Sequence, residues 1–508
     1  MQLTELLHGE NIVSCNGSLA TEITAIACDS RKVVPGALFF ALPGALADGH
    51  QYIDQAVNNG ATALLVEDSS KTSNTVPWVQ VPAGYGRKVM SHIASRFYGN
   101  STDNLPLVGI TGTNGKTTIS YILEGILTAA DIPSAVLGTI SYRFGNHCIE
   151  ASHTTPESIE LHRQLNQLAA LGAKGFVMEV SSHALEQHRV DGCHFDVAIF
   201  TNLTRDHLDY HGDMEQYKLA KMRLFSELMQ PDEIKPVRHA VINLDDPAGE
   251  EFAKAAACPV ISYGLHPQAM VTVQNLSLSV KGISATLVTP QGSADFCSRL
   301  LGSYNLSNIL AAAAAGHALG FTVETIVKGI ENHLTVPGRL QEVPNQKQVT
   351  CLVDYAHTGD ALQNVLHTLR ALSTGRLITV FGCGGDRDLG KRSVMGEIAA
   401  SYADLAVVTS DNPRTEDPLQ IIGQIKDGIA PLGLHEYQQW EIAGGFIEKG
   451  FICLPDRHEA IRFAVSIAKP GDILLLAGKG HETYQISGRE KHHFDDYEEA
   501  IKAFGELV

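Results

Sequence analysis

A chain of 508 residues is too long for a single hydrophobic core, so we expect about three or four domains. Its composition, with 44 % hydrophobic and 19 % charged residues, is that of an ordinary globular protein. Lysine and arginine number 38 against 56 aspartate and glutamate residues, and the resulting net charge of −18 repels polyanions, so we expect no nucleic-acid partner.

Targeting and redox signals are absent from the sequence. The opening residues Met1-Gln2-Leu3-Thr4-Glu5 lack the basic and apolar regions of a signal peptide, and no stretch approaches the roughly 18 apolar residues of a membrane span. The nine cysteines include no Cys-x-x-Cys pair, which argues against a disulfide framework and a zinc site. We therefore expect a cytoplasmic monomer with reduced thiols and no membrane insertion.

The first part of the chain, residues 1–95, is predicted to be a small α/β unit. Its short apolar runs at 37–41, 63–66 and 78–81 are typical of buried strands separated by turns. The polar turn Asp29-Ser30-Arg31 precedes one of them and, taken alone, is most simply a surface loop.

A glycine loop at residues 108–118 is the strongest motif in the chain. The preceding residues 105–110 are apolar and rich in β-forming side chains, whereas residues 118–130 carry apolar side chains at helical spacing. The segment is therefore predicted to be a strand, a glycine loop and a helix.

The chemistry of this loop favours a nucleoside triphosphate. Its glycines let backbone N–H groups turn toward a phosphate, Lys116 adds a positive charge, and Thr117 offers a hydroxyl to Mg²⁺ at a helix N-terminus. The loop departs from the usual P-loop because Ile110 stands where the first glycine is expected. The alternative is an ordinary glycine turn between a strand and a helix.

Polar residues follow three further apolar runs, at 175–180, 197–200 and 239–242. In open parallel sheets, ligands bind at the carboxyl ends of the strands, so these endings are where we expect chemistry. Glu179 at the end of the first run is the best acidic candidate, and its alternative role is a structural ion pair.

Five histidines near these endings raise the question of a zinc site. His207 and His211 are spaced to lie on one helical face, but the whole set fits no common zinc pattern. At a nucleotide site, Mg²⁺ held by oxygen ligands is the more typical metal. We therefore expect hydrogen-bonded structural roles or single ligands for His183, His188, His194, His207 and His211.

The segment 301–321 contains Asn305 and Asn308 ahead of an alanine-rich helix, where the default role of asparagine is a helix cap. Pro337-Gly338-Arg339 then breaks the pattern and predicts a hinge into a third α/β unit, residues 337–508.

The third unit repeats the pattern of strands with polar endings. Asp417 and Pro418 predict the N-cap and first position of a helix, which places Arg414 on the loop that precedes this helix. The strands are predicted at residues 349–353, 377–381, 405–408 and 473–476.

Together with the glycine loop, seven motifs resemble the Mur ligase family, in the family's order and over essentially the whole chain. The family's own variant loop accounts for Ile110. The seven motifs are Thr154-Thr155-Pro156, Glu179-Val180-Ser181-Ser182-His183, Asp206-His207-Leu208-Asp209-Tyr210-His211, Tyr304-Asn305-Leu306-Ser307-Asn308, Pro337-Gly338-Arg339, Asp354-Tyr355-Ala356-His357 and Asp411-Asn412-Pro413-Arg414.

The resemblance implies three α/β domains. They would be an N-terminal UDP-substrate-binding domain at 1–95, a central ATP-binding domain of the P-loop type with a mostly parallel sheet at 96–336, and a Rossmann-like amino-acid-binding domain at 337–508. It also implies an enzyme of peptidoglycan precursor synthesis that uses ATP and Mg²⁺. This enzyme would join UDP-N-acetylmuramoyl-L-alanyl-D-glutamate to meso-2,6-diaminopimelate through an acyl phosphate, with release of ADP.

Residue roles also come from the resemblance. The catalytic set would be Lys116, Glu179, His207 and Lys221. ATP would be bound by Gly112, Thr113, Asn114, Gly115, Lys116, Thr117, Thr118, Asn305, Arg339 and Asp354. The UDP-muramoyl dipeptide would be bound by Ser30, Thr154, Thr155, Ser181, Gln187 and Arg189. Diaminopimelate would be bound by Arg387, Asp411, Asn412, Pro413, Arg414, Gly478 and Glu482.

The metal ligands implied by the resemblance are Thr117, Glu179, His207 and a carbamylated Lys221. A carbamate replaces a cationic amine by an anionic oxygen ligand, which an unmodified lysine cannot supply. Without the resemblance, Lys221 is most simply a solvated lysine on a helix.

Three features depart from the family pattern. Gly359 stands where the family usually has proline, and the segment 432–450 is longer than the family needs. The loop 44–48 lacks the polar side chains often found at this uridine-side turn.

Two other functions remain open at this point. A sister ligase would add lysine or extend a folate with glutamate, and Arg414 favours diaminopimelate over these acceptors. A nucleotide-dependent switch would belong to a different class, but the sequence has no Asn-Lys-x-Asp guanine motif. A switch would also have little use for a further domain with charged strand endings.

Overall fold

The computed structural model describes residues 1–508 except 45–46, 73–74, 333–334 and 507–508. It confirms the predicted α/β class. The chain divides into two compact units, each of which we describe by itself. The first unit comprises Met1–Gln274, Leu287–Ala294 and Asn308–Asn332, and the second comprises Asn275–Thr286, Asp295–Ser307 and His333–Val508.

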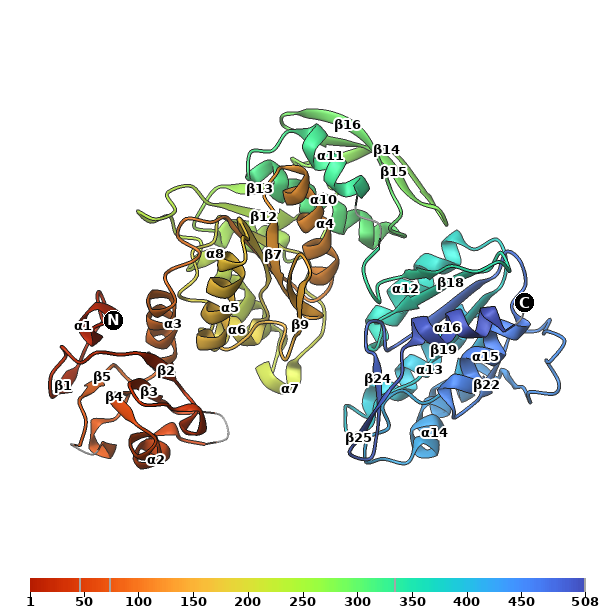
Figure 1. The fold of residues 1–508 in the computed structure, drawn as a ribbon. Coiled ribbons are helices and arrows are strands. Elements are labelled where there is room, and N and C mark those ends of the chain that lie inside the picture. The colour runs from red at the N-terminus through yellow and green to blue at the C-terminus, as the bar shows by residue number, and fades with distance from the viewer. Residues whose placement is uncertain (45–46, 73–74, 333–334, 507–508) are drawn as a thin grey trace. The chain divides into compact units, whose positions relative to one another are not determined.

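A five-stranded sheet forms at the start of the first unit, in the order β1-β5-β4-β3-β2 (Figure 1). All pairs are parallel except β1 with β5. The three predicted strands are present as β3, β4 and β5. The elements are β1 (Ser14–Asn16), β2 (Ala25–Ala27), β3 (Ala37–Ala41), β4 (Ala61–Val66), β5 (Trp78–Gln80), α1 (Leu3–Leu6), α2 (Ile53–Asn58), α3 (Gly86–Phe97) and the 3-10 helices η1 (Ser30–Lys32), η2 (Gly49–Tyr52) and η3 (Ser69–Lys71).

An eight-stranded sheet follows in the same unit, in the order β13-β12-β11-β6-β10-β7-β8-β9. It is parallel from β13 to β7, and β8 and β9 extend it as an antiparallel edge. The strands are β6 (Leu107–Thr111), β7 (Ser134–Leu137), β8 (Ser141–Phe144), β9 (His147–Glu150), β10 (Gly175–Glu179), β11 (Val197–Phe200), β12 (His239–Asn243) and β13 (Val260–Tyr263).

Helices on this sheet are built from the amphipathic segments between the strands. The predicted strand, loop and helix around residue 112 are confirmed as β6 and α4, with Gly115 as the N-cap of α4. The helices are α4 (Lys116–Ala129), α5 (Ser158–Ala170), α6 (Ser182–Glu186), α7 (Leu208–His211), α8 (Met214–Ser226), α9 (Gly249–Ala255) and α11 (Val323–Asn332).

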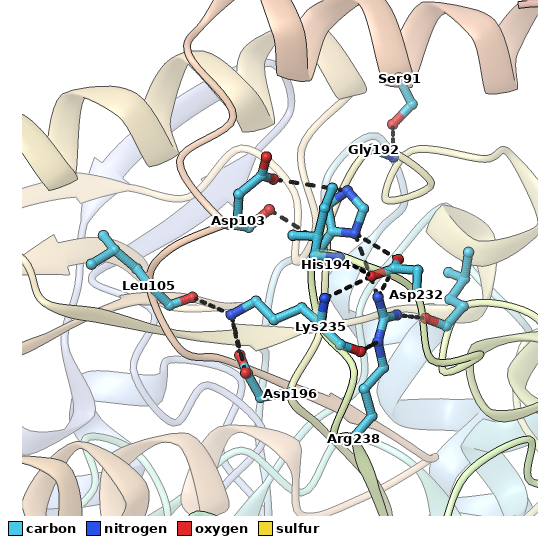
Figure 2. A network of polar contacts seen from close by, with 12 residues as sticks. Ser91, Asp103, Leu105, Gly192, His194, Asp196, Asp232, Lys235 and Arg238 are labelled. Carbon is cyan, nitrogen blue, oxygen red and sulfur yellow. Dashed lines mark hydrogen bonds and ion pairs between the residues drawn. The ribbon is translucent and has the colours of Figure 1, made fainter. Parts of the chain in front are cut away.

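A network of charged side chains fixes the start of β6 (Figure 2). The Lys235 ammonium donates to the Leu105 carbonyl at 3.1 Å and to the Asp196 carboxylate at 2.9 Å. The same carboxylate accepts from the Leu107 amide at 2.7 Å. His194 lies between Asp103 and Asp232, at 3.8 and 3.2 Å. The amino end of β6 is therefore held by ion pairs and hydrogen bonds, and the glycine loop follows its carboxyl end.

In chain order, a three-stranded meander and the long helix α10 (Ser303–Ala318) follow the eight-stranded sheet and precede the seven-stranded sheet of the second unit. The meander has the order β14-β15-β16 and was not predicted. Its strands are β14 (Thr272–Ser279), β15 (Gly282–Thr289) and β16 (Gly292–Ser298).

The second unit holds a seven-stranded sheet in the order β17-β18-β23-β19-β20-β22-β21, parallel except for β17. The four predicted strands are present as β18, β19, β20 and β23. The strands are β17 (Gln341–Val343), β18 (Thr350–Asp354), β19 (Leu377–Phe381), β20 (Leu405–Val408), β21 (His435–Glu436), β22 (Gly450–Cys453) and β23 (Ile473–Ala477).

The remaining elements of the second unit are five α-helices, the 3-10 helix η4 (Ala430–Leu432) and a hairpin of β24 (Tyr484–Ser487) and β25 (Glu490–His493). Asp417 and Pro418 form the predicted cap and first turn of α14. The long segment 432–450 contributes Ile442 and Phe446 to the hydrophobic core of this unit, so part of it has a packing role. The helices are α12 (Gly359–Leu372), α13 (Gly390–Tyr402), α14 (Pro418–Ile429), α15 (Arg457–Ile467) and α16 (Asp496–Gly505).

Thr358 caps α12 by accepting a hydrogen bond from the Ala361 amide, so the helix begins normally although Gly359 replaces the family's proline. Across the ranges that the structure describes, no helix is long and apolar enough to cross a membrane.

Candidate active site

The glycine loop packs so closely on its neighbours that two of its positions require glycine. Gly112 has φ +146°, and a Cβ there would lie 1.8 Å from Thr201 Oγ1. Gly115 has φ +91°, and a Cβ there would lie 2.3 Å from Asn308 Oδ1. A side chain at either position would displace the backbone. The loop leads directly into the N-terminus of α4, and a helix N-terminus preceded by a glycine loop is an arrangement that phosphates bind.

Asn202, just after β11, holds this loop in place. Its carbonyl accepts from the Thr113 amide and its side-chain oxygen accepts from the Asn114 amide, both at 2.9 Å. The Asn114 carbonyl in turn accepts from the Thr201 hydroxyl at 2.7 Å. The loop conformation is therefore set by the neighbouring strand end as well as by its own glycines.

Two lysines converge on one carbonyl of the loop. The ammonium groups of Lys116 and Lys221 donate to the Gly112 oxygen at 2.8 and 2.9 Å. Lys221, on α8, is buried, and its nitrogen lies 4.3 Å from the centre of the Tyr217 ring. Burial, together with the charge of Lys116, lowers the pKa of Lys221 well below its ordinary value. The alternative of a solvated helix lysine is therefore wrong.

Glu179 ends β10 and is buried beside the glycine loop. Its carboxylate accepts from the Thr117 hydroxyl at 3.1 Å and from the Thr139 hydroxyl and amide at 2.8 and 3.1 Å. A hydroxyl and a carboxylate at this spacing form an oxygen donor set, which suits Mg²⁺. No cation side chain takes part in these contacts, so the structural ion pair considered for Glu179 is not what holds it.

The five histidines form no single cluster, although the His183 ring centre lies 5.0 Å from that of His207 and 5.3 Å from that of His211. His188 pairs with Asp191 and His194 with Asp232, while His211 contacts Ser182 and Glu186. In the described part of the chain, no group of three or more His, Cys, Asp and Glu side chains is placed to hold a metal ion.

His207 stands at the N-cap of α7 with φ +53°, and its side chain is about half exposed, at 48 %. Its ring centre lies 6.1 Å from that of Tyr217, the same ring that Lys221 contacts. Partial burial lowers the pKa of His207, so its imidazole is neutral at pH 7 and able to act as a ligand.

Most residues expected to hold the dipeptide lie together. The Arg189 guanidinium donates to the Thr155 carbonyl at 2.8 Å and to the Gln187 side chain at 2.8 Å. The Thr155 hydroxyl accepts from the Ser181 amide at 3.0 Å. Thr154 is linked to this group through Thr139, with their hydroxyls 3.1 Å apart, and Thr139 also contacts Glu179.

Ser30 lies elsewhere in the first unit, in the wall of a cavity of about 530 Å³. The cavity wall also contains Glu157, which pairs with Arg189 at 2.7 Å, so the cavity borders the dipeptide group. The Ser30 hydroxyl is buried and donates to Gln55 at 2.8 Å, whereas Arg31 beside it is exposed, so the turn lies at the surface with Ser30 directed inward. The turn 44–48 borders the cavity through Gly44 and Ala47, and residues 45–46 lie outside the described residues.

Asn305, of the expected ATP set, and Asn308 do not cap α10, because this helix begins at Ser303 and contains both. Asn305 is buried and donates to the Leu301 carbonyl at 2.8 Å. In the second unit, the Asp354 carboxylate accepts from the Leu340 amide at 2.8 Å. Burial raises the pKa of Asp354. The Arg339 guanidinium lies 4.8 Å from the centre of the Tyr355 ring.

The expected acceptor residues gather at the carboxyl ends of β20 and β23. Asn412 donates to the Glu482 carboxylate at 3.0 Å. Gly478 has φ +113°, and a Cβ there would lie 3.9 Å from Asp411 Oδ2, so this glycine is needed for its backbone conformation. Burial and the nearby Asp411 raise the pKa of Glu482. Arg387, after β19, is exposed.

Arg414 has no carboxylate partner next to it in the sequence. Its guanidinium donates to the Gly385 carbonyl at 2.7 Å. Glu416 instead pairs with Arg392 at 2.8 Å, and the Asp417 side chain caps α14. The structural ion pair considered as the alternative for Arg414 is therefore wrong. Pro413, just before it, is buried.

Three residues of this site have no role in the sequence prediction: Thr139, Asn202 and Lys479. Thr139 follows β7, so applying the strand-end rule to that strand too would have found it. Asn202 and Lys479 lie within predicted strand endings, but only the structure shows what their side chains contact.

An open, mostly parallel sheet with a glycine loop between its central strand and the next helix defines an α/β protein of the P-loop class. Three family models match this chain. They are described as Mur ligase middle domain, over residues 110–316, Mur ligase, glutamate ligase domain, over residues 338–480, and Mur ligase family, catalytic domain, over residues 22–98. The chain belongs to the Mur ligase family.

Relatives and a solved structure agree with this assignment. The chain is 58 % identical to the UDP-N-acetylmuramoyl-L-alanyl-D-glutamate--2,6-diaminopimelate ligase of Geobacter metallireducens, covering 100 % of this chain and 99 % of the relative. It is 57 % identical to the enzyme of the same name from Geobacter sulfurreducens, covering 99 % of each. A solved structure with that name is 34 % identical, has a TM-score of 0.72, and is matched over 100 % of this chain and 99 % of the other.

Gly115→Ala tests whether the glycine loop binds the nucleotide. The substitution should weaken ATP binding by about tenfold or more, because the new Cβ would push the loop away from Asn308. The matched control is Gly320→Ala, which also has a positive φ, +83°, but has nothing within 4 Å of the new Cβ. Calorimetric titration of both variants with ATP checks this, and equal losses would show that backbone strain alone is responsible.

Proposed function

We propose that this protein is an ATP-dependent ligase that joins meso-2,6-diaminopimelate to UDP-N-acetylmuramoyl-L-alanyl-D-glutamate in peptidoglycan precursor synthesis. The names of the relatives supply the substrates. The observation that carries them to this chain is Arg414, whose neighbouring carboxylates are engaged elsewhere and whose guanidinium is available to a substrate carboxylate. Diaminopimelate differs from lysine by one such carboxylate.

The reaction has two chemical steps. A carboxylate is a poor electrophile, so the D-glutamate oxygen first takes the γ-phosphoryl group of ATP, forming an O–P bond as ADP leaves. The amine nitrogen of diaminopimelate then attacks the acyl carbon, and the C–N bond forms as phosphate leaves and the amine loses a proton. Charge spreads over the phosphoryl oxygens during transfer, so cations and amide donors must be arranged beforehand.

The residues of the glycine loop would perform the first step. Its amides and Lys116 would hold the phosphates, and Mg²⁺ would supply charge neutralisation at the transferring group. The oxygen donors Thr117 and Glu179 fit this ion, with His207 and a carbamylated Lys221 completing its ligands.

Carbamylation of Lys221 is supported by its surroundings. Attack on CO₂ requires a neutral amine, and burial beside Lys116 favours the neutral form of Lys221. The nitrogen bonds to the CO₂ carbon and loses a proton, which leaves an anionic carbamate. A negative carbamate there would also attract the Lys116 ammonium, which donates to the same Gly112 carbonyl.

Binding roles for the other residues follow from where they lie. Thr154, Thr155, Ser181, Gln187 and Arg189 would hold the dipeptide, and Ser30 the uridine end, because its cavity borders that group. Asn305, Arg339 and Asp354 would face ATP. Arg387, Asp411, Asn412, Pro413, Gly478 and Glu482 would bind diaminopimelate together with Arg414.

We also propose that residues 1–95, 96–336 and 337–508 are the UDP-substrate, ATP and amino-acid domains. The family models over residues 22–98, 110–316 and 338–480 fall one to each of these domains, apart from residues 96–98, which supports the division.

The central test is ADP formation with each substrate omitted in turn. We expect release only when ATP, Mg²⁺, the UDP-muramoyl dipeptide and diaminopimelate are all present, because an acyl phosphate must be kept from water until the amine arrives. A coupled assay for ADP and mass analysis of the product check this. ADP release with nucleotide alone would indicate a nucleotide-dependent switch and would contradict the ligase function.

Lys221→Ala and Lys221→Arg should both remain folded and lose activity by on the order of 100-fold or more, because neither can form the carbamate. The matched control is Lys218→Ala on the same helix. Lys218 pairs with Glu215 and Glu251 and should be dispensable. Steady-state assays at saturating Mg²⁺ check this. Full activity in Lys221→Arg would rule out the carbamate.

Arg414→Ala should lose about 100-fold or more in kcat/KM for diaminopimelate, because two charge-assisted hydrogen bonds to its distal carboxylate are lost. Any activity with lysine should change far less, so kcat/KM for diaminopimelate divided by kcat/KM for lysine should fall. Arg489→Ala, at an exposed arginine before β25, is the control and should leave the ratio unchanged. An equal loss with both amino acids would show that Arg414 only supports its loop.

A further inference from the structure

Lys479 is a fully buried lysine in the loop after β23, beside the acceptor residues. Its ammonium donates to the Tyr484 carbonyl at 2.6 Å and to the Asn412 side-chain oxygen at 3.2 Å. It also lies 3.4 Å from Asp411 Oδ1 and 3.8 Å from Glu482 Oε2, and its own side chain is 0 % exposed. A buried charge of this kind persists only where other groups compensate it.

The contacts of Lys479 determine which way the Asn412 amide faces. The Asn412 oxygen accepts from the Lys479 ammonium and from the Ile486 amide, the latter at 2.9 Å. A flipped amide would set its NH₂ group against two donors. The Asn412 nitrogen is therefore directed to the Glu482 carboxylate, 3.0 Å away.

The same lysine ties the acceptor loop to the hairpin beside it. Gln485, on β24, donates to the Asp411 carbonyl at 2.7 Å. The Arg414 amide donates to the Ile486 carbonyl at 3.1 Å. Lys479 adds a bond to the Tyr484 carbonyl at the start of β24. Main-chain bonds place the loop next to the hairpin, and Lys479 connects both to the carboxylates.

Lys479 lies between two carboxylates. Its ammonium is 3.4 Å from Asp411 and 3.8 Å from Glu482, and Asp411 Oδ1 is buried with no hydrogen-bond partner among the described residues. Burial and the charge of Asp411 raise the pKa of Glu482, whereas Lys479 and Arg414 lower it. Removing the lysine should therefore raise the pKa of Glu482 further.

We propose that Lys479 is a positioning residue of the acceptor site. It orients Asn412 and holds the carboxylates of Asp411 and Glu482 on either side of its ammonium, so that they receive the ammonium group of a zwitterionic amino-acid end whose carboxylate binds Arg414. This inference rests on the proposed function. It assigns Lys479 no contact with the reacting atoms.

Lys479→Met is the principal test, with KM measured for each substrate. KM for diaminopimelate should rise on the order of 10- to 100-fold, while KM for ATP and for the UDP-muramoyl dipeptide should stay within about twofold. Lys479→Arg retains the charge and should recover much of the loss. Lys347→Met is the matched control, because Lys347 donates to the carbonyls of Val465 and Ser466 at 2.8 and 2.9 Å, away from the acceptor residues.

A pH profile separates this role from simple support of the fold. Removing the cation raises the pKa of Glu482, so the acid limb of the pH profile of kcat/KM for diaminopimelate should move to higher pH in Lys479→Met. The other charges near Glu482 are unchanged in this variant: they are those of Asp411 and Arg414, and that of the buried Arg457, which pairs with Asp496. Lys479→Gln keeps a hydrogen-bond donor but removes the charge. It should therefore show the same shift of the acid limb, with a smaller rise in KM for diaminopimelate.

Each outcome decides the inference. An unchanged KM for diaminopimelate in folded Lys479→Met, or an equal rise for all three substrates, would overturn it. Thermal unfolding verifies that the variants fold, and failure of both Lys479→Met and Lys479→Gln to fold would show a core role and would also overturn it. The wild type is assayed in parallel. A wild type that makes no product contradicts the proposed function. An active wild type, with Lys479 variants whose KM for diaminopimelate is unchanged, contradicts only the role of Lys479.

Discussion

The glycine loop at residues 108–118 depends on two lysine side chains that contact the same backbone carbonyl. Lys116 and Lys221 both donate to the Gly112 oxygen, and Lys221 does so from a buried position. Like charges at this spacing repel, and burial adds to the cost of keeping both. Burial and the charge of Lys116 favour the neutral form of Lys221, while Asp206 acts in the opposite direction. The proposed carbamate at Lys221 requires this neutral amine, and the charge of Lys116 would attract a nucleotide phosphate.

Strands with strong local signals were predictable from sequence, whereas sheet extensions were not. The run before the glycine loop forms β6 with every residue buried, so its apolar pattern is unmistakable. Strand β14 is mostly exposed, and β9 alternates between half-buried and exposed residues. Such strands form because they pair with a neighbour, and pairing partners lie outside any local window of sequence.

The same distinction applies to the candidate site. Glu179 and Arg414 could be found because strand endings of a parallel sheet gather at one edge. The contacts of Thr139 with Glu179 depend on β7 lying next to β10, and that order cannot be read along the chain. Asn305 was open to the wrong role, as a helix cap, but α10 begins at Ser303, two residues before Asn305. Residue types were predictable, and their partners required the fold.

Local charge outweighs the net charge of the molecule at these sites. A chain with a net charge of −18 repels ATP and a UDP-linked substrate at long range, because both of these substrates are anions. Screening reduces this repulsion beyond about 8 Å at physiological ionic strength, so only groups near the ligand decide binding. The glycine loop places Lys116 at the start of α4, whereas the acceptor loop places the carboxylates of Asp411 and Glu482 around Lys479. In the function we propose, the first arrangement would receive a polyphosphate and the second the ammonium group of an amino acid, because the charges that decide binding are those within a few ångströms of each ligand.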